Sequence, residues 1–163
     1  MKEKHCERIT NTLGPHQVSW CLSVGLSNCN KALAASMQAT AFAEEYTDEL
    51  GLTGNPREQM QNAIRHATWM ALLLVRGFTS EEAMSFGAAH ELDVLDPDLG
   101  VGSFEANVDF HNNLVGVTYG KLITSGPEFD RKHEDYNTSV VKWIVTHSYG
   151  PECTGLCLDL RGT

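Results

Sequence analysis

Histidine and acidic residues recur in three consecutive segments in the middle of the chain. His66 lies in the first segment, the pair His90 and Glu91 in the second, and Asp109 in the third. Imidazole and carboxylate groups are normal donors for zinc, iron or manganese, and additional amide and carboxylate oxygens favour harder ions such as calcium. The same groups can also perform metal-free acid–base catalysis or form a buried polar network. The residue types alone leave these three interpretations open.

The third segment carries the largest polar set. With about 100° between successive residues of a helix, several polar and glycine residues fall within about 60° of Asp109. They are Glu105, Asn112, Asn113, Gly116 and Gly120. A carboxylate facing the protein interior costs several kcal/mol unless a cation or hydrogen bonds compensate it. We therefore expect an inward polar stripe here, with a partner for Asp109.

The second segment places two chemically useful residues side by side. His90 and Glu91 are neighbours, and about 100° separates neighbours on a helix, so we expect only one of them to point at a common centre. The other would orient it or exchange protons. Gly87 lies one turn before the histidine, and glycine inside a helix indicates a close approach by another helix or by a ligand.

Helices must position these residues, because glycine and proline separate blocks with a period near 3.6 and alternating strand patterns are nearly absent. Asn55 is the expected N-cap of the helix containing His66, and Thr79 or Ser80 opens the next helix with a capping box. The expected helices span 15–26, 30–50, 55–76, 79–92, 103–124 and 127–147. The sequence predicts one compact all-α domain over 1–163, of five to six bundled or orthogonal helices, with a motif core over 55–121.

Charge and hydropathy exclude two classes of protein. The 163 residues carry a net charge of −9, which opposes nucleic-acid binding because Lys and Arg supply most of that affinity. The apolar run that ends at Val75 is far shorter than the roughly 20 residues of a membrane span. No Lys or Arg occurs between Arg76 and Lys121, although eight acidic residues do. A missing positive charge is therefore to be sought near the inward acids.

Five cysteines lie only in the two end segments, 1–30 and 148–163. Cys21 and Cys29 are spaced for one short disulfide loop, Cys153 and Cys157 for another, and Cys6 is left over. No CxxC pair indicates a cysteine zinc site. The first residues lack the apolar stretch of a signal peptide, so we expect none in this chain.

Three ordered motifs resemble a little-characterised bacterial all-helical domain. They are RHxxW at Arg65–Trp69, AHE at Ala89–Glu91, and DxxNNxxG at Asp109–Gly116. Such domains occur in secreted proteins and at the C-terminal ends of polymorphic toxins and secretion-system effectors. The resemblance covers about 55–121 and implies that the motif residues form one site. Those residues are Arg65, His66, Trp69, His90, Glu91, Asp109, Asn112 and Asn113.

These observations lead to a hydrolase hypothesis. His66, His90 and Asp109 would hold a divalent cation, with zinc as the first candidate and calcium or manganese as alternatives. Glu91 would act as general base or fourth ligand, and His90 would join the catalytic set. Arg65, Trp69, Asn112 and Asn113 would bind substrate, Arg65 and Asn113 also serving catalysis.

The acidic chain favours a small substrate, such as a phospholipid head group or a cell-envelope component, over nucleic acid. Delivery out of the producing cell would fit the resemblance, as would an immunity-type partner protein. The alternative is a non-catalytic interaction module with a structural polar core and an acidic surface that meets a basic partner.

Overall fold

The computed structural model describes residues 13–94, 103–151 and 153–161, and within them the chain forms six helices and no strand. The helices are α2 (Pro15–Val24), α3 (Leu26–Glu49), α4 (Gly54–Val75), α5 (Ser80–Val94), α6 (Phe104–Ser125) and α7 (Glu134–Thr146). The predicted all-α class is confirmed. Cys6, the first residues and most of the loop expected after Asp93 lie outside the described residues.

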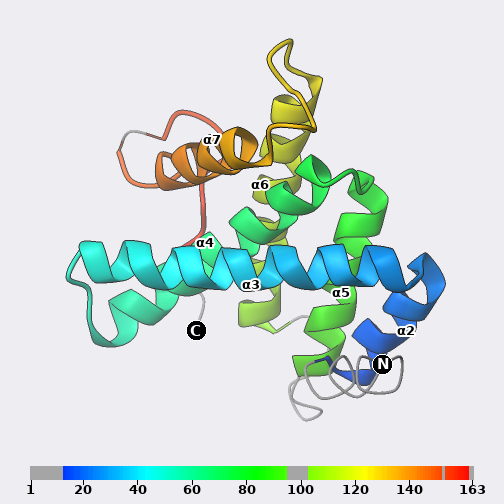
Figure 1. Cartoon of the computed structure of the whole chain (residues 1–163). Coiled ribbons are helices and arrows are strands. Elements are labelled where there is room, and N and C mark those ends of the chain that lie inside the picture. The colour runs from blue at the N-terminus through cyan, green and yellow to red at the C-terminus, as the bar shows by residue number, and fades with distance from the viewer. Residues whose placement is uncertain (1–12, 95–102, 152, 162–163) are drawn as a thin grey trace.

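Helix α4 lies at the centre of the molecule and contacts α3, α5, α6 and α7. Every residue from His66 to Val75 is at most 5% exposed, as expected for a segment whose later turns are apolar on nearly all sides. Figure 1 shows α3 as one long helix spanning the molecule, with α6 running across it rather than alongside it. His66 therefore lies in the core, between the helices that carry the other candidate residues.

Glycines allow the site-bearing helices to approach closely. A Cβ atom at Gly116 of α6 would lie 2.2 Å from the carbonyl oxygen of Ala67, and one at Gly87 of α5 would lie 2.8 Å from Asn113 Nδ2. Neither position can hold a side chain without movement of its neighbours. The close approach expected at Gly87 is confirmed, and Gly116 brings α6 directly against the turn of α4 that carries His66.

One of the two predicted helix caps is present in the structure. At the start of α5, Thr79 N–H donates to Glu82 Oε2 at 2.8 Å and Glu82 N–H donates to Thr79 Oγ1 at 3.1 Å, which confirms the capping box. The N-cap expected at Asn55 is wrong, because α4 already begins at Gly54 after Thr53. Pro56 still lies in the first turn, where its missing N–H costs nothing.

Two other helix starts differ from the prediction. Helix α3 begins at Leu26 and includes Cys29, whereas a turn was expected there. Helix α7 begins at Glu134 and not at Pro127. The carboxylate of Asp130 accepts from the Lys132 N–H at 2.9 Å, and such a local turn competes with the helical hydrogen bonds.

Two disulfides join the cysteines that the sequence pairs. Cys21–Cys29 ties α2 to α3, and Cys153–Cys157 closes a short loop near the C-terminus. Both predicted pairs are confirmed. Disulfides persist in oxidising compartments and are rare in the cytosol, so these two are compatible with an extracellular location. None of the helices in the described part of the chain is long and apolar enough to cross a membrane.

A buried carboxylate fixes the end of α5 that carries His90 and Glu91. Asp93 accepts hydrogen bonds from the backbone N–H groups of His16 and Gln17, at 2.8 and 2.9 Å, and so caps the N-terminus of α2 from another helix. Burial alone would raise the pKa of Asp93, but these N–H donors and the His16 ring outweigh it and lower the pKa below its usual value. Helix α5 is thereby anchored beside its functional residues.

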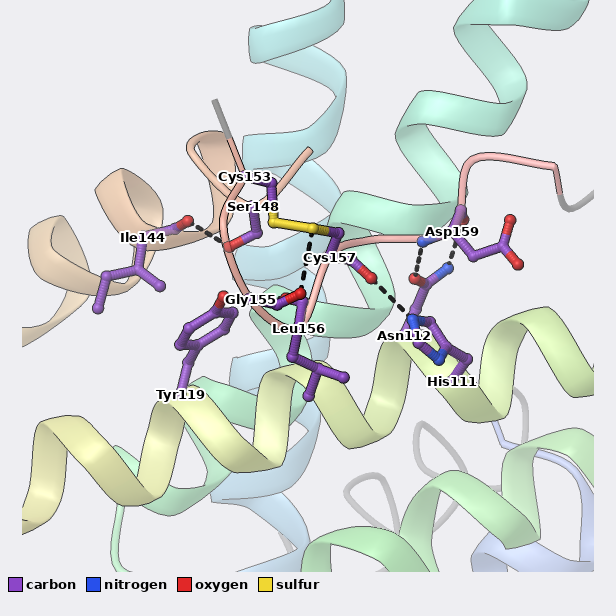
Figure 2. Close-up of a disulfide and its surroundings, with 10 residues drawn as sticks. All are labelled: His111, Asn112, Tyr119, Ile144, Ser148, Cys153, Gly155, Leu156, Cys157 and Asp159. Carbon is purple, nitrogen blue, oxygen red and sulfur yellow. Dashed lines mark hydrogen bonds between the residues drawn. A yellow bond between two sulfur atoms is a disulfide. The ribbon is translucent and has the colours of Figure 1, made fainter. Parts of the chain in front are cut away.

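The C-terminal segment docks on α6 through side chains of that helix, as Figure 2 shows. Asn112 donates to the Asp159 carbonyl at 2.9 Å and accepts from the Asp159 N–H at 2.8 Å. His111 Nε2 donates to the Cys157 carbonyl at 2.7 Å, and the Tyr119 hydroxyl donates to the Leu156 carbonyl at 2.9 Å. Asn112 thus binds the backbone of Asp159 and lies outside the cluster of motif residues in which the sequence analysis placed it.

Replacing Asn112 with Ala should lower the free energy of unfolding by about 2–3 kcal/mol, because two backbone groups of Asp159 lose their partners. Asn112→Asp keeps the acceptor but sets a buried carboxylate oxygen against the Asp159 carbonyl, so it should cost at least as much. Urea titration measures the loss, and hydrogen exchange at the Asp159 N–H locates it. An unchanged exchange rate in Asn112→Ala would contradict the docking role.

Candidate functional site

Four of the predicted residues converge where α4, α5 and α6 meet. His66, His90 and Glu91 each offer one ligand atom, and these atoms lie within 4.8 Å of one another. Asp109 Oδ1 lies 3.6 Å from His66 Nε2. The expectation that only one of His90 and Glu91 could face a common centre is wrong, because both side chains reach the same side of the last turns of α5.

A hydrogen bond to Asn113 fixes the tautomer of the His66 ring. Its Nδ1–H donates to Asn113 Oδ1 at 2.9 Å, since a carbonyl oxygen can only accept. The lone pair is therefore on Nε2, which faces Asp109. Asn113 is 1% exposed and its oxygen is occupied by this bond, so it positions His66 and does not meet a substrate as the sequence predicted. Partners of this kind commonly orient histidine ligands.

The Asp109 carboxylate has an amide partner that lies outside the three sequence motifs. Asn62 Nδ2 donates to Asp109 Oδ1, and Asn62 Oδ1 accepts from Arg65 Nη2 at 2.8 Å. The same Nη2 lies 3.5 Å from His66 Nε2. Burial raises the pKa of Asp109, although the Asn62 hydrogen bond and the Arg65 charge oppose the rise. Asn62 lies one turn before His66, and helical spacing places it on the same face of the helix, within about 60° of His66.

Both histidines are neutral at pH 7. Burial, followed by the charge of Arg65, lowers the pKa of His66 to about 4. Burial, followed by the charges of His66 and Arg65, lowers the pKa of His90 to about 4. Neutral imidazoles have a lone pair that can bind a cation, and in His66 this lone pair on Nε2 faces Arg65 Nη2 at 3.5 Å, a contact that a bound cation would replace. These two rings can therefore act as ligands over a wide pH range without losing a proton.

Glu91 presents a buried oxygen without a partner. Its Oε1 has no hydrogen bond among the described residues. Burial, and then the nearby charge of Asp109, raises the pKa of Glu91 to about 7. A buried carboxylate of this kind needs a proton or a cation. From the sequence, a positive charge was expected near the inward acidic residues. Glu91 is the acidic residue beside which such a charge is needed.

The remaining predicted residues surround the cluster. Trp69 is 4% exposed and its ring meets His90 edge-on at 5.5 Å between centroids, so it forms a wall of the cluster. Glu105, expected to face inward, is exposed at the first turn of α6. Arg65 is half-buried and lines a cavity of about 230 Å³ between α3 and α4. Sequence reasoning missed this cavity, because nothing marks its walls locally.

The pKa shifts predict how stability depends on pH in the metal-free protein. In the unfolded chain, His66 and His90 take up protons near pH 6.5. In the folded protein they take up protons only near pH 4. The free energy of unfolding therefore falls as the pH drops from 6.5 to 4. Glu91 acts in the opposite direction, because its folded pKa of about 7 favours the folded state at low pH.

Replacing Glu91 with Gln removes that compensation, so the variant should lose stability more steeply between pH 6.5 and 4.5 than the parent does. Urea midpoints measured in EDTA across this range test the expectation, with Glu45→Gln on an exposed face of α3 as the matched control. Equal pH slopes in Glu91→Gln and the parent would rule it out.

Comparison with known proteins identifies a family without an assigned activity. The family model described as a domain of unknown function, DUF6973, matches residues 19–145, which span α4, α5 and α6 with every residue of the cluster. No curated protein and no solved structure matches the chain. The match covers most of the 163 residues. The chain therefore belongs to the DUF6973 family.

Proposed function

We propose that the protein is a metal-assisted hydrolase of phosphate esters, with its centre at His66, His90 and Glu91. One observation carries the proposal: two neutral imidazoles and a buried, unpartnered carboxyl oxygen lie within reach of one point. Two histidines and one carboxylate form a normal catalytic zinc set, which leaves a position open for water or substrate. Donor atoms around a tetrahedral zinc ion lie about 3.3 Å apart, so the side chains would close in slightly on binding.

The proposal exchanges two roles assigned from the sequence. Glu91, and not Asp109, completes the ligand set, because the Glu91 Oε1 atom lies with the two imidazoles and has no hydrogen-bond partner among the described residues. Asp109 becomes the general base. One of its oxygens accepts from Asn62, which fixes the carboxylate beside the centre. The raised pKa of Asp109 suits a group that must accept a proton.

The chemistry divides between the ion and the side chains. A divalent ion supplies a Lewis acid, which lowers the pKa of water to about 7 and stabilises charge on phosphate oxygens. Asp109 takes a proton from the attacking water and returns it to the leaving alcohol oxygen. Arg65, next to His66, binds a non-bridging phosphate oxygen. Zinc is the ion that two imidazoles favour, while calcium and manganese remain for the test.

A phospholipid or cell-envelope substrate and action outside the producing cell complete the proposal. The net charge of −9 disfavours nucleic acid as the source of the phosphate. The two disulfides support an oxidising destination. A secreted toxin or effector with an immunity-type partner agrees with both features.

Zinc titration by calorimetry tests the ligand set through the protons released. Because Glu91 has a pKa of about 7, the loss of its proton should contribute about 0.9 proton at pH 6 and about 0.1 at pH 8, in addition to any proton released by a metal-bound water. Buffers with different ionisation enthalpies measure this number. In Glu91→Gln, any residual binding should release no proton from this position. A parent protein that releases no more protons at pH 6 than Glu91→Gln does would contradict Glu91 as a ligand.

A second function is favoured by one feature of the cluster. Asn113, His66, Arg65, Asn62 and Asp109 form a continuous chain of polar contacts, which can exist without any ion. Such a network would fix the register of α4 and α6 in a non-catalytic interaction module. Asp109→Ala and His66→Ala separate the two functions. If the residues are structural, both variants unfold. If they are catalytic, the variants stay folded and lose activity.

A further inference from the structure

The cavity beside the cluster has walls of both charges. It measures about 230 Å³ and lies between α3 and the first half of α4. Glu44 and Thr40 line it from α3, and Glu58, Asn62 and Arg65 line it from α4. Asn62 and Arg65 also contact the cluster, through Asp109 and His66. Asn62 and Arg65 therefore border both the cavity and the proposed metal centre.

The two acidic residues of the cavity are not paired with a basic side chain of the described residues. Glu44 and Glu58 make no ion pair or side-chain hydrogen bond within the described ranges. The nearby guanidinium of Arg57 is already paired with Asp48, at 2.7 Å. Two uncompensated carboxylates on facing helices make one end of the cavity a place for a positive group. Because both side chains are exposed, they reach such a group without a burial cost.

The opposite end of the cavity offers unused hydrogen-bond donors. Both hydrogen bonds of Arg65, to Asn62 Oδ1 and toward His66 Nε2, use the Nη2 nitrogen. Its Nε and Nη1 groups have no acceptor in the part of the chain that is described. A guanidinium with free N–H groups binds phosphate oxygens well. The cavity thus matches a ligand with a cation at one end and a phosphate at the other.

We propose that this cavity binds the ammonium end of a phosphoethanolamine group, with the phosphate on Arg65 beside the metal centre. This inference rests on the proposed function and names its substrate class. A primary ammonium donates three hydrogen bonds, which Glu44 and Glu58 can accept. A trimethylammonium donates none and is recognised by aromatic rings, and none of the described residues that line the cavity is aromatic. The cavity therefore selects ethanolamine over choline.

Calorimetry with zinc-loaded protein tests this selection. Phosphoethanolamine should bind at least about tenfold more tightly than phosphocholine or inorganic phosphate. The double variant Glu44→Gln/Glu58→Gln should bring all three ligands to similar affinity, whereas Glu45→Gln, outside the cavity, should change nothing. Equal affinities in the parent protein, or an unchanged preference in the double variant, would overturn the proposal.

Two further measurements complete the test. One separates failure of the metal centre from failure of the cavity, and the other separates a lipid head group from a free ester. Elemental analysis of the same samples shows whether zinc is bound, so failure of the metal centre is seen separately from failure of the cavity. A preference for phosphoethanolamine in zinc-free protein would still support the cavity. Co-sedimentation with phosphatidylethanolamine vesicles, but not with phosphatidylcholine vesicles, supports a lipid head group. Binding of soluble glycerophosphoethanolamine without co-sedimentation supports a free ester.

Discussion

Asp109→Asn is expected to lower turnover of a phosphate ester by about 10²–10⁴-fold while leaving zinc binding intact. The asparagine has the size of the aspartate but cannot accept the proton of the attacking water. Asn62 can still bond its side-chain oxygen, so the local structure should persist. The expected phenotype is therefore a folded, metal-loaded and nearly inactive protein.

Glu91→Gln should give the complementary result, in which zinc binding weakens and activity falls with it. A neutral amide is a poor zinc ligand, and the other two ligands are uncharged. Turnover of bis(p-nitrophenyl) phosphate and zinc content are measured on both variants, with Glu105→Gln on the exposed first turn of α6 as control. Loss of zinc from Asp109→Asn with retention in Glu91→Gln would reverse the two roles.

Gly116→Ala is expected to lower the free energy of unfolding by about 3 kcal/mol or more, the upper end of the usual cost of overpacking. The new methyl group would lie 2.2 Å from the Ala67 carbonyl oxygen and 2.8 Å from Met70 Cβ. A backbone carbonyl cannot rotate away as a flexible side chain can. Helices α4 and α6 must therefore separate to admit it.

The same substitution should also weaken zinc binding. Ala67 follows His66 directly, and Asn113, which orients the His66 ring, lies one turn before Gly116 on α6. Urea titration and zinc affinity are compared with those of Gly155→Ala, where nothing lies within 4 Å of the added carbon. Equal stability in both variants would mean that the contact between α4 and α6 is looser than described.

The helical periodicity of the sequence was enough to predict the class of fold and the central position of α4. The run after Ala67 has no polar side, and such a helix is stable only when other helices surround it. The capping box at Thr79 was equally predictable, because both partners lie within four residues. A local pattern of this kind is predictable because both interacting residues lie in the same short segment of sequence.

Contacts between distant segments were not predictable in the same way. Asn112 and Asn113 are neighbours on one polar stripe, yet one bonds Asp159 and the other His66, each 47 residues away. About 100° of rotation separates them, which is enough to place them against different neighbours of α6. The stripe predicted that both amides would have partners, and it could not name those partners.

The geometry of the cluster depended on side-chain reach. His90 and Glu91 diverge at the backbone, but their length brings an atom of each close to His66. The cavity walls formed by Glu44 and Glu58 carry no sequence signal, because exposed glutamates on helices are ordinary. Only the packing of α3 against α4 places them beside Arg65.

Metal content tests the central claim most directly. Protein purified without chelator is subjected to elemental analysis beside a His66→Asn/His90→Asn double variant, with circular dichroism to verify that both are folded. We expect one zinc ion per parent chain, none in the variant, and a lower melting temperature of the parent in EDTA, because bound metal stabilises the folded state. A folded parent protein that contains no stoichiometric zinc, calcium or manganese, and whose melting temperature EDTA leaves unchanged, would contradict the metal centre.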